Sequence, residues 1–307
     1  MSESRTLVIG SRGSALALWQ ARHIQGKLAE LGAEARIEII KTTGDKIQDV
    51  SLAKVGGKGL FTKEIEEALL AGDIDLAVHS MKDVPTEIPA GLIIAAIPER
   101  EEARDALVGC SLVELKAGSR IGTSSLRRAS QLHALNRGLA IETLRGNVDT
   151  RLRKLDEGKY DAIVLAAAGL RRLGWQDRIR ELIPVEIMCP AVGQGALAIE
   201  TRTDGGKDGG EARELVKRLD NHGARATVAA ERALLATLGG GCQVPVGAHA
   251  TLEAGVIDLR AIVASPDGGR VIRGELSGGD PAETGSQLGR MLLEQGAREI
   301  LAEVYAA

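Results

Sequence analysis

The sequence predicts an α/β protein in which two α/β domains are followed by a smaller α+β domain. A chain of 307 residues is too long for one ordinary hydrophobic core, so two or three domains are expected. The first two-thirds of the chain alternates short β-type runs with helical patterns, which is typical of a sheet with crossover helices. From about Arg225 the order changes to one helix, three strands and a last helix. We therefore expect three domains.

The first domain is expected to contain three strands and two long helices. The strands are Thr6–Ile9, Ala35–Ile40 and Ile74–Val78. The helices begin after the capping residues Ser14 and Thr62 and end near Leu31 and at Gly72. The third strand would deliver the segment 79–83, which contains Lys82 and Asp83, at its C-terminal end.

The second domain repeats this plan. A strand at Ile121, a glycine turn and a hydroxyl cap within Thr123–Ser125 are expected to lead into a helix, and a further strand follows at 141–144. The stretch 158–164 echoes 72–78, which supports two domains of similar build and leaves open whether they arose by duplication. The last domain is expected to hold a helix to Leu238, strands near 245–251, 256–264 and 270–276, and a helix from about Ala282.

The composition argues against several classes of function. A net charge of -3 gives no overall attraction to nucleic acid or to anionic lipid. With two tryptophans, two tyrosines and one phenylalanine, the chain has too few aromatic residues for a base-stacking surface. No apolar run approaches the roughly 20 residues that span a bilayer, and the N-terminal segment lacks the pattern of a secretory signal. We expect a cytoplasmic protein that binds neither nucleic acid nor a membrane.

The three cysteines are widely spaced and form no CxxC pair, which argues against a disulfide framework and a zinc site. We interpret Cys110 and Cys189 as small buried residues. Cys242 follows three glycines, which favour an exposed turn, and is therefore the better candidate for a reactive thiol. The five histidines show no metal-ligand spacing, so no metal is expected, and His79 at the end of an apolar strand is interpreted as structural.

Cationic residues gather where the predicted strands end, which is where open α/β sheets bind ligands. The nine residues are Arg12, Lys54, Lys58, Lys82, Arg127, Arg128, Arg145, Arg151 and Arg172. Each alone could simply be solvated on a loop. Their shared placement predicts a polyanion-binding cleft between the two α/β domains. Lys54 and Lys58 lie in a glycine-rich stretch that we interpret as a mobile lid, because it lacks the spacing of a phosphate-binding loop.

Arg127 and Arg128 fall in the first turn of a predicted helix, where the helix dipole disfavours a cation. An anion bound at the same N-terminus would explain them. Since water would fill the predicted cleft in the free chain, we expect Arg127→Leu and Arg145→Leu to weaken ligand binding and to change stability little.

Seven segments, in order along nearly the whole chain, resemble the porphobilinogen deaminase (hydroxymethylbilane synthase) family. They are Ser11–Ala21, Leu52–Phe61, Ala77–Pro85, Gly122–Arg128, Leu144–Val148, Pro190–Ala196 and Gly240–Pro245. We find no departure from the family pattern at these positions. The differences fall in linkers, in 203–211 and in the last domain.

The resemblance implies a fold and a set of site residues. Two domains similar to periplasmic binding proteins would occupy 1–98 and 99–193, with a return to the first at about 194–217 and an α+β domain at 218–307. A dipyrromethane cofactor would be attached through Cys242, and Asp83 would be the central catalytic residue. Cofactor contacts would come from Lys82, Asp83, Ser125, Arg127, Arg128 and Arg145. Substrate contacts would come from Arg12, Ser14, Lys54, Lys58, Phe61, Arg151, Arg172 and Gln194.

The resemblance also implies a transferase that deaminates four porphobilinogen units and joins them into hydroxymethylbilane, in tetrapyrrole biosynthesis. We expect a monomer. A two-lobed anion-binding protein without catalysis shares the predicted fold, but it does not explain an exposed Cys242 on a glycine turn. A thiol-dependent acyl transferase that uses Cys242 lacks an identifiable histidine partner.

Overall fold

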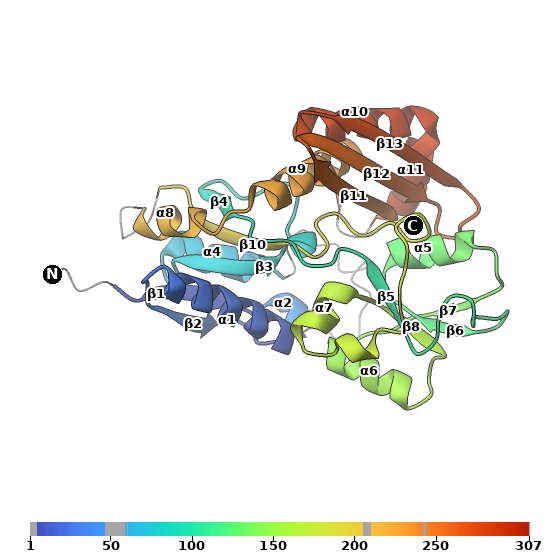
Figure 1. The fold of residues 1–307 in the computed structure, drawn as a ribbon, viewed down its shortest axis with the longest axis horizontal. Coiled ribbons are helices and arrows are strands. Elements are labelled where there is room, and N and C mark those ends of the chain that lie inside the picture. The colour runs from blue at the N-terminus through green and yellow to red at the C-terminus, as the bar shows by residue number, and fades with distance from the viewer. Residues whose placement is uncertain (1–4, 47–58, 60, 205–209, 242–243, 307) are drawn as a thin grey trace. The chain divides into compact units, whose positions relative to one another are not determined.

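The computed structural model describes residues 5–46, 59, 61–204, 210–241 and 244–306 (Figure 1). Its strands form two five-stranded sheets and one three-stranded sheet. The chain divides into two compact units, of which unit 1 comprises 1–100 with 196–225 and unit 2 comprises 101–195 with 226–307. No helix among the described residues is long and apolar enough to cross a membrane.

The sheet of unit 1 has the strand order β2-β1-β3-β10-β4. Strands β1 (Leu7–Ser11), β2 (Ala35–Ile39) and β3 (Leu76–Ser80) are parallel. Strand β10 (Leu197–Arg202) is inserted antiparallel between β3 and β4 (Leu92–Ala96). The chain therefore returns to complete the first sheet after it has formed the second.

Helices cover both faces of this sheet because alternate strand residues point to opposite sides. On one face, Leu76 and Val78 pack in a cluster with α1 (Ala15–Glu30) and α8 (Glu211–Lys217). On the other face, Ala77 packs with α4 (Lys63–Ala71). The short helix α2 spans Thr43–Lys46, and the 3-10 turn Met81–Asp83 follows β3 directly.

Unit 2 contains the second five-stranded sheet, in the order β7-β6-β8-β5-β9. Its strands are β5 (Asp105–Val108), β6 (Arg120–Gly122), β7 (Ala140–Glu142), β8 (Ala162–Ala166) and β9 (Glu181–Leu182). The helices of this part are α5 (Leu126–Ala134), α6 (Val148–Asp156), α7 (Ala167–Arg172) and the 3-10 turn Gln176–Arg178. Two apolar clusters share these strands, as expected for a sheet that is buried on both faces.

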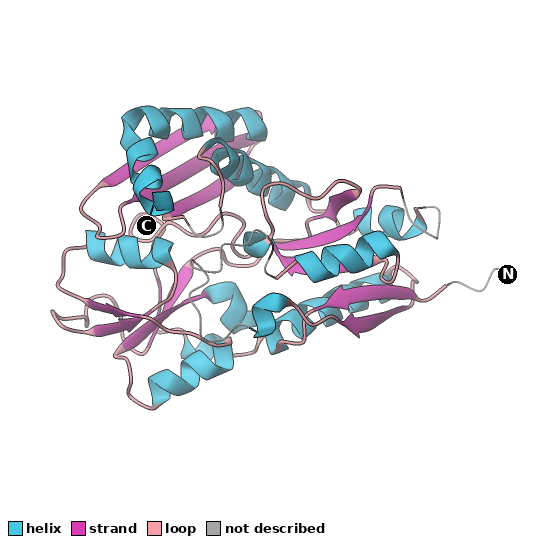
Figure 2. Cartoon of the chain, turned by 180° about the vertical axis from the view of Figure 1, so that it is seen from behind, coloured by secondary structure: helices cyan, strands magenta, loops and turns pink. Residues whose placement is uncertain are grey.

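The rest of unit 2 is an antiparallel sheet, β11-β12-β13, covered by helices (Figure 2). Its strands are β11 (Val246–Glu253), β12 (Val256–Ala264) and β13 (Val271–Gly278). Its helices are α9 (His222–Thr237, which starts in unit 1), α10 (Pro281–Leu292) and α11 (Arg298–Ala306). One apolar cluster joins this sheet to all three helices. A π-helical segment at Leu293–Ala297 connects α10 to α11, with Gly296 in the left-handed region.

The structure confirms the predicted class, with two α/β sheets and a C-terminal α+β part. The main helices and strands lie within a few residues of the predicted bounds. Strand β3 begins and ends two residues later than predicted, so His79 and Ser80 belong to the strand. Thr62 occupies the N-cap position of α4 but makes no capping hydrogen bond with its side chain, because its backbone is already helical. Strands β4, β5, β9 and β10 were not predicted.

Candidate active site

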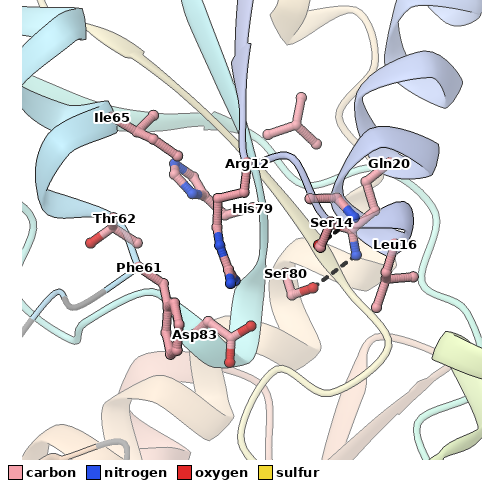
Figure 3. Close-up of a pocket in the computed structure, with 12 residues that line it drawn as sticks. Arg12, Ser14, Leu16, Gln20, Phe61, Thr62, Ile65, His79, Ser80 and Asp83 are labelled. Carbon is pink, nitrogen blue, oxygen red and sulfur yellow. Dashed lines mark hydrogen bonds between the residues drawn. The ribbon is translucent and has the colours of Figure 1, made fainter. Parts of the chain in front are cut away.

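A cavity of about 70 Å³ lies in unit 1, where β1 and β3 end and α1 begins (Figure 3). We call it the β3 pocket. Its lining residues are Arg12, Ser14, Leu16, Ala17, Gln20, Phe61, Thr62, Ile65, Val78, His79, Ser80 and Asp83. Because β1 and β3 are parallel, their carboxyl ends meet at one edge of the sheet, and the pocket lies at the edge where such sheets bind ligands.

Two side-chain interactions fix the wall of the pocket that α1 supplies. The Ser14 hydroxyl accepts a hydrogen bond from the backbone N–H of Ala17 at 3.3 Å and so caps α1. The buried amide of Gln20, further along α1, donates from Nε2 to the Ser80 Oγ at 2.8 Å. Helix α1 is therefore tied to the end of β3, just before the turn that carries Asp83.

The charged residues of the β3 pocket are Arg12 and Asp83, which point into the same space (Figure 3). The Arg12 guanidinium lies over the Phe61 ring, 4.2 Å from its centroid, which orients the cation without neutralising it. Asp83 is exposed and ends the 3-10 turn after β3. A fixed carboxylate and a fixed guanidinium side by side can bind a ligand that carries both an amine and a carboxylate.

A buried His–Glu contact that the sequence did not reveal lies beside the pocket, which His79 lines. His79 Nε2 lies 3.0 Å from Glu200 Oε2, and the two side chains are 5% and 1% exposed. Glu200 belongs to β10, which returns to the sheet beside β3 from far along the chain. Nothing in the sequence indicated that β10 lies beside β3, so the contact between His79 and Glu200 could not be predicted.

A second cluster of predicted site residues lies in unit 2, around the fully buried Asp105. Arg127 Nη1 is 2.8 Å from one carboxylate oxygen, and Arg128 Nη2 is 2.7 Å from the other. Burial alone would raise the pKa of the Asp105 carboxyl, but the two guanidiniums outweigh it and hold that pKa well below its usual range. Asp105 is therefore ionised, and this group of three side chains carries one more positive than negative charge.

The turn at 194–195 is bound to the same cluster. Gln194 Nε2 donates to Asp105 Oδ1 at 2.9 Å and to the Ala103 carbonyl at 2.7 Å. Arg172 Nη2 donates to the Gly195 carbonyl at 2.6 Å. Burial lowers the pKa of Arg172 to about 10, which still leaves it charged at neutral pH. Gly195 has φ +89°, and a Cβ there would lie 2.2 Å from the Glu101 carbonyl oxygen, so only glycine fits.

The remaining predicted residues of unit 2 lie near helix N-termini. Ser125 caps α5 by accepting a hydrogen bond from the backbone N–H of Arg128 at 3.4 Å. Arg145 is half-buried in the turn before α6, and Arg151 Nε donates to the Gly146 carbonyl at 2.7 Å.

In unit 1, Lys82 is half-buried in the turn beside Asp83. Lys54, Lys58 and Cys242 lie outside the described residues.

The structure thus brings two groups of predicted residues together. Unit 1 gathers Arg12, Ser14, Phe61 and Asp83 around the β3 pocket. Unit 2 gathers Arg127, Arg128 and Gln194 around Asp105. Asp105 was missed, because it ends a run of mixed charges at 99–105 that suggests an exposed loop.

Two family models match most of the chain. Residues 7–208 match the family model described as porphobilinogen deaminase, dipyromethane cofactor binding domain. Residues 225–294 match the model of the porphobilinogen deaminase C-terminal domain. The chain belongs to the porphobilinogen deaminase family. The resemblance inferred from the seven segments is confirmed.

Similar proteins of the family match over almost their full length. The porphobilinogen deaminase of Syntrophobacter fumaroxidans is 51% identical over 311 residues, covering 99% of each chain. That of Pelotomaculum thermopropionicum is 52% identical over 304 residues, covering 97% of this chain and 96% of its own. Among solved structures, the L-cystine solute receptor of Neisseria gonorrhoeae is 13% identical with a TM-score of 0.40, covering 71% of this chain and 87% of its own. A score this low carries no argument about fold or function.

The residues of unit 2 fit the carboxylate groups of the cofactor that the family model names. Asp105 compensates one of the two guanidiniums in its cluster, so the cluster keeps a net positive charge, which is complementary to a ligand carboxylate. Arg127 and Arg128 also lie in the first turn of α5, where backbone N–H groups favour an anion.

The sequence alone predicts little effect of Arg127→Leu on stability, because water would surround Arg127 in the free chain. The structure contradicts that reason. The side chain of Arg127 is 5% exposed and pairs with Asp105 instead of standing in water. Its removal would leave part of a buried negative charge uncompensated, which costs about 3–5 kcal/mol in comparable pairs. Because Arg128 still pairs with Asp105, we expect Arg127→Leu to lower the free energy of unfolding by about 3 kcal/mol.

The measurement is chemical denaturation of the cofactor-free chain, with Arg145→Leu as the control. Arg145 is half-buried on a turn, and such substitutions change stability by about 0.5 kcal/mol or less when no buried pair is broken. Equal stability of the wild type and Arg127→Leu would mean that the Asp105 pair contributes nothing in the free chain.

Proposed function

We propose that this chain joins four porphobilinogen units, one after another, into the linear tetrapyrrole hydroxymethylbilane. The observation that supports this most is the combination of a full-length family match with a pocket that pairs the Asp83 carboxylate with the Arg12 guanidinium. Porphobilinogen carries an amine and two carboxylates, which are the charges complementary to those two side chains. The chain would work in the cytosol as a monomer.

Asp83 is the catalytic residue in this proposal. Loss of ammonia from porphobilinogen leaves a positively charged azafulvene, and a fixed carboxylate stabilises the charge as it develops. Asp83 suits this role because it is exposed to the pocket and carried by a turn that the Gln20–Ser80 hydrogen bond supports. The same carboxylate would accept hydrogen bonds from pyrrole N–H groups.

The cations bind the acetate and propionate groups. With two carboxylates on each pyrrole, six units would present about twelve carboxylates, which explains why one protein needs so many arginines and lysines. Arg12 would bind the incoming unit together with Phe61 and Ser14, and Lys54, Lys58, Arg151, Arg172 and Gln194 would contact substrate units. Lys82, Ser125, Arg127, Arg128 and Arg145 would hold the cofactor. Planar recognition of carboxylates favours arginine over lysine.

Cys242 would anchor the dipyrromethane cofactor through a thioether. When bound, the cofactor supplies the pyrrole to which the substrate units are added. We also propose the three domains predicted from the sequence, at 1–98 with 194–217, 99–193 and 218–307. The last of these would carry the anchoring cysteine.

The proposal is tested by incubating the purified full chain with porphobilinogen. We expect hydroxymethylbilane and one ammonia for each unit consumed, and an intact mass that exceeds the chain by two pyrrole units. A two-lobed anion-binding protein would instead have the mass of the chain alone and would return porphobilinogen unchanged. That result would overturn the proposed function.

A further inference from the structure

The His79–Glu200 pair has the geometry of an oriented base. His79 lies on β3 and Glu200 on the neighbouring strand β10, and both side chains are buried. The 3.0 Å contact joins Nε2 to the carboxylate, so Nε2 carries the proton and donates it. The other ring nitrogen, Nδ1, has no hydrogen-bond partner among the described residues. In the neutral ring, Nδ1 is then the atom with a lone pair to accept a proton.

His79 also lines the β3 pocket, together with Arg12 and Asp83 (Figure 3). The same ring therefore lines the pocket and contacts Glu200 through Nε2. Nucleophile-activating and general-base histidines have this arrangement, in which a carboxylate behind the ring fixes the tautomer and stabilises the imidazolium.

Two carboxylates lie close to the His79 ring. Glu66 of α4 lies close to the same pair, and burial raises its pKa, an effect that Glu200 reinforces and the Thr62 hydroxyl opposes. Glu200 is 1% exposed, so its carboxylate lies beside the ring in a low-dielectric environment, where it is placed to stabilise an imidazolium. The charged residues that line the pocket together with His79 are Arg12 and Asp83, one of each sign.

We propose that His79 accepts the proton that leaves a pyrrole α-carbon when two porphobilinogen units are joined, and that Glu200 is its positioning residue. The inference rests on the proposed function. In the balanced step, the C–N bond of one unit breaks and releases ammonia, and a C–C bond forms to the α-carbon of the other unit. The electrons of the C–H bond at that carbon restore the aromatic ring, and the proton moves to Nδ1. It then passes to the released ammonia, which leaves as ammonium.

A separate base leaves Asp83 free for its electrostatic role. Asp83 must stay negative while the azafulvene cation forms, and a proton on its carboxylate would remove that stabilisation. The pocket contains an exposed carboxylate, Asp83, and a buried imidazole, His79, with a carboxylate beside it. These different environments allow Asp83 to stabilise the cation while His79 accepts the proton.

The first experiment compares His79→Gln with wild type in single-turnover reactions with porphobilinogen and with porphobilinogen deuterated at the free α-carbon. Glutamine keeps a hydrogen-bonding group near Glu200 but has no basic nitrogen. We expect the rate to fall about 10²-fold, as is usual for loss of a general base. The deuterium effect should grow, because proton removal becomes the slow step. A loss that leaves the deuterium effect unchanged would make His79 merely structural and overturn the proposal.

The matched control is His23→Gln, which removes an exposed histidine stacked on Trp19 outside the pocket. It should keep the wild-type rate and the wild-type deuterium effect. If wild type itself forms no hydroxymethylbilane, the proposed function fails. If wild type forms it and His79→Gln is equally fast, only the present inference fails.

A second measurement needs no turnover. Nitrogen-15 spectra of the histidines in the cofactor-free chain should show the neutral His79 ring with its proton on Nε2. Glu200→Gln should lower the fraction of this tautomer, because the carboxylate that accepts the Nε2 proton's hydrogen bond is gone. A proton fixed on Nδ1, or an imidazolium throughout the working pH range, would overturn the inference even if a variant failed to fold.

Discussion

Asp83→Asn is expected to lose on the order of 10²–10³ or more in kcat, because it deletes the charge that stabilises the azafulvene cation. Asparagine keeps the size of the side chain and one hydrogen-bond acceptor. The pocket itself should survive, since the Gln20–Ser80 hydrogen bond and the Arg12–Phe61 contact do not involve Asp83. Porphobilinogen should therefore still bind through its carboxylates, and the loss should appear in kcat more than in KM.

Asp83→Glu separates the contribution of charge from that of position. Glutamate keeps the charge but displaces it by one methylene, so it should retain more activity than Asp83→Asn while staying below wild type. Single-turnover kinetics should be measured only on molecules whose intact mass shows two extra pyrrole units, because a variant that cannot assemble its cofactor would be inactive for another reason. Equal activity of Asp83→Asn and wild type would refute the charge argument. A lower rate for Asp83→Glu than for Asp83→Asn would mean that the placement of hydrogen bonds contributes more than the charge.

Local signals in the sequence were enough to predict one wall of the β3 pocket. The hydroxyl cap at Ser14 follows an apolar strand, and this order alone predicts where the helix begins. The same reasoning predicted a hydroxyl cap within 123–125, which the structure places at Ser125, and the two arginines in the first turn of α5. Caps and glycine turns are short-range features, so one sequence carries them completely.

Pairings between distant residues could not be predicted in this way. Strand β10 completes the first sheet only after the second sheet has formed, and without it Glu200 has no known neighbour. Asp105 stands in a run of charged residues that suggests an exposed loop, yet it is fully buried. Burial of a carboxylate is favourable here only because α5 supplies two guanidiniums, and that contact depends on the packing of β5 against its neighbours.

The burial of Asp105 also changes the interpretation of the two arginines in α5. Sequence reasoning attributed the cations at an unfavourable helix terminus to a ligand anion alone. The structure adds an internal anion, Asp105, that accounts for one of the two charges in the free chain. The remaining charge still favours a ligand, so Arg127 has both a structural and a proposed binding role.

Cys242→Ser is expected to lack the whole cofactor mass and to lose nearly all activity. The other two thiols are poor substitutes. Burial raises the pKa of Cys189 to about 12, and burial also raises the pKa of the half-buried Cys110. Only the thiolate is a nucleophile, so both react slowly at neutral pH. Cys242 directly follows a turn in which Gly239 has a positive φ of 88°, where glycine is favoured.

The experiment is intact-mass measurement of Cys242→Ser beside Cys110→Ser, each expressed as the full chain, with denaturation curves for both. Cys110→Ser should keep the two extra pyrrole units and its activity, since Cys110 is a half-buried residue that contacts the apolar cluster beside β5 and is none of the predicted site residues. Cys242→Ser should unfold at nearly the wild-type denaturant concentration when both proteins lack cofactor, because a hydroxyl replaces a thiol of similar size. Cofactor mass that persists in Cys242→Ser would move the anchor to another cysteine. If Cys242→Ser lost both the cofactor mass and the folded state, the missing cofactor would be a result of misfolding. The Cys110→Ser control shows whether a cysteine-to-serine change alone unfolds the chain.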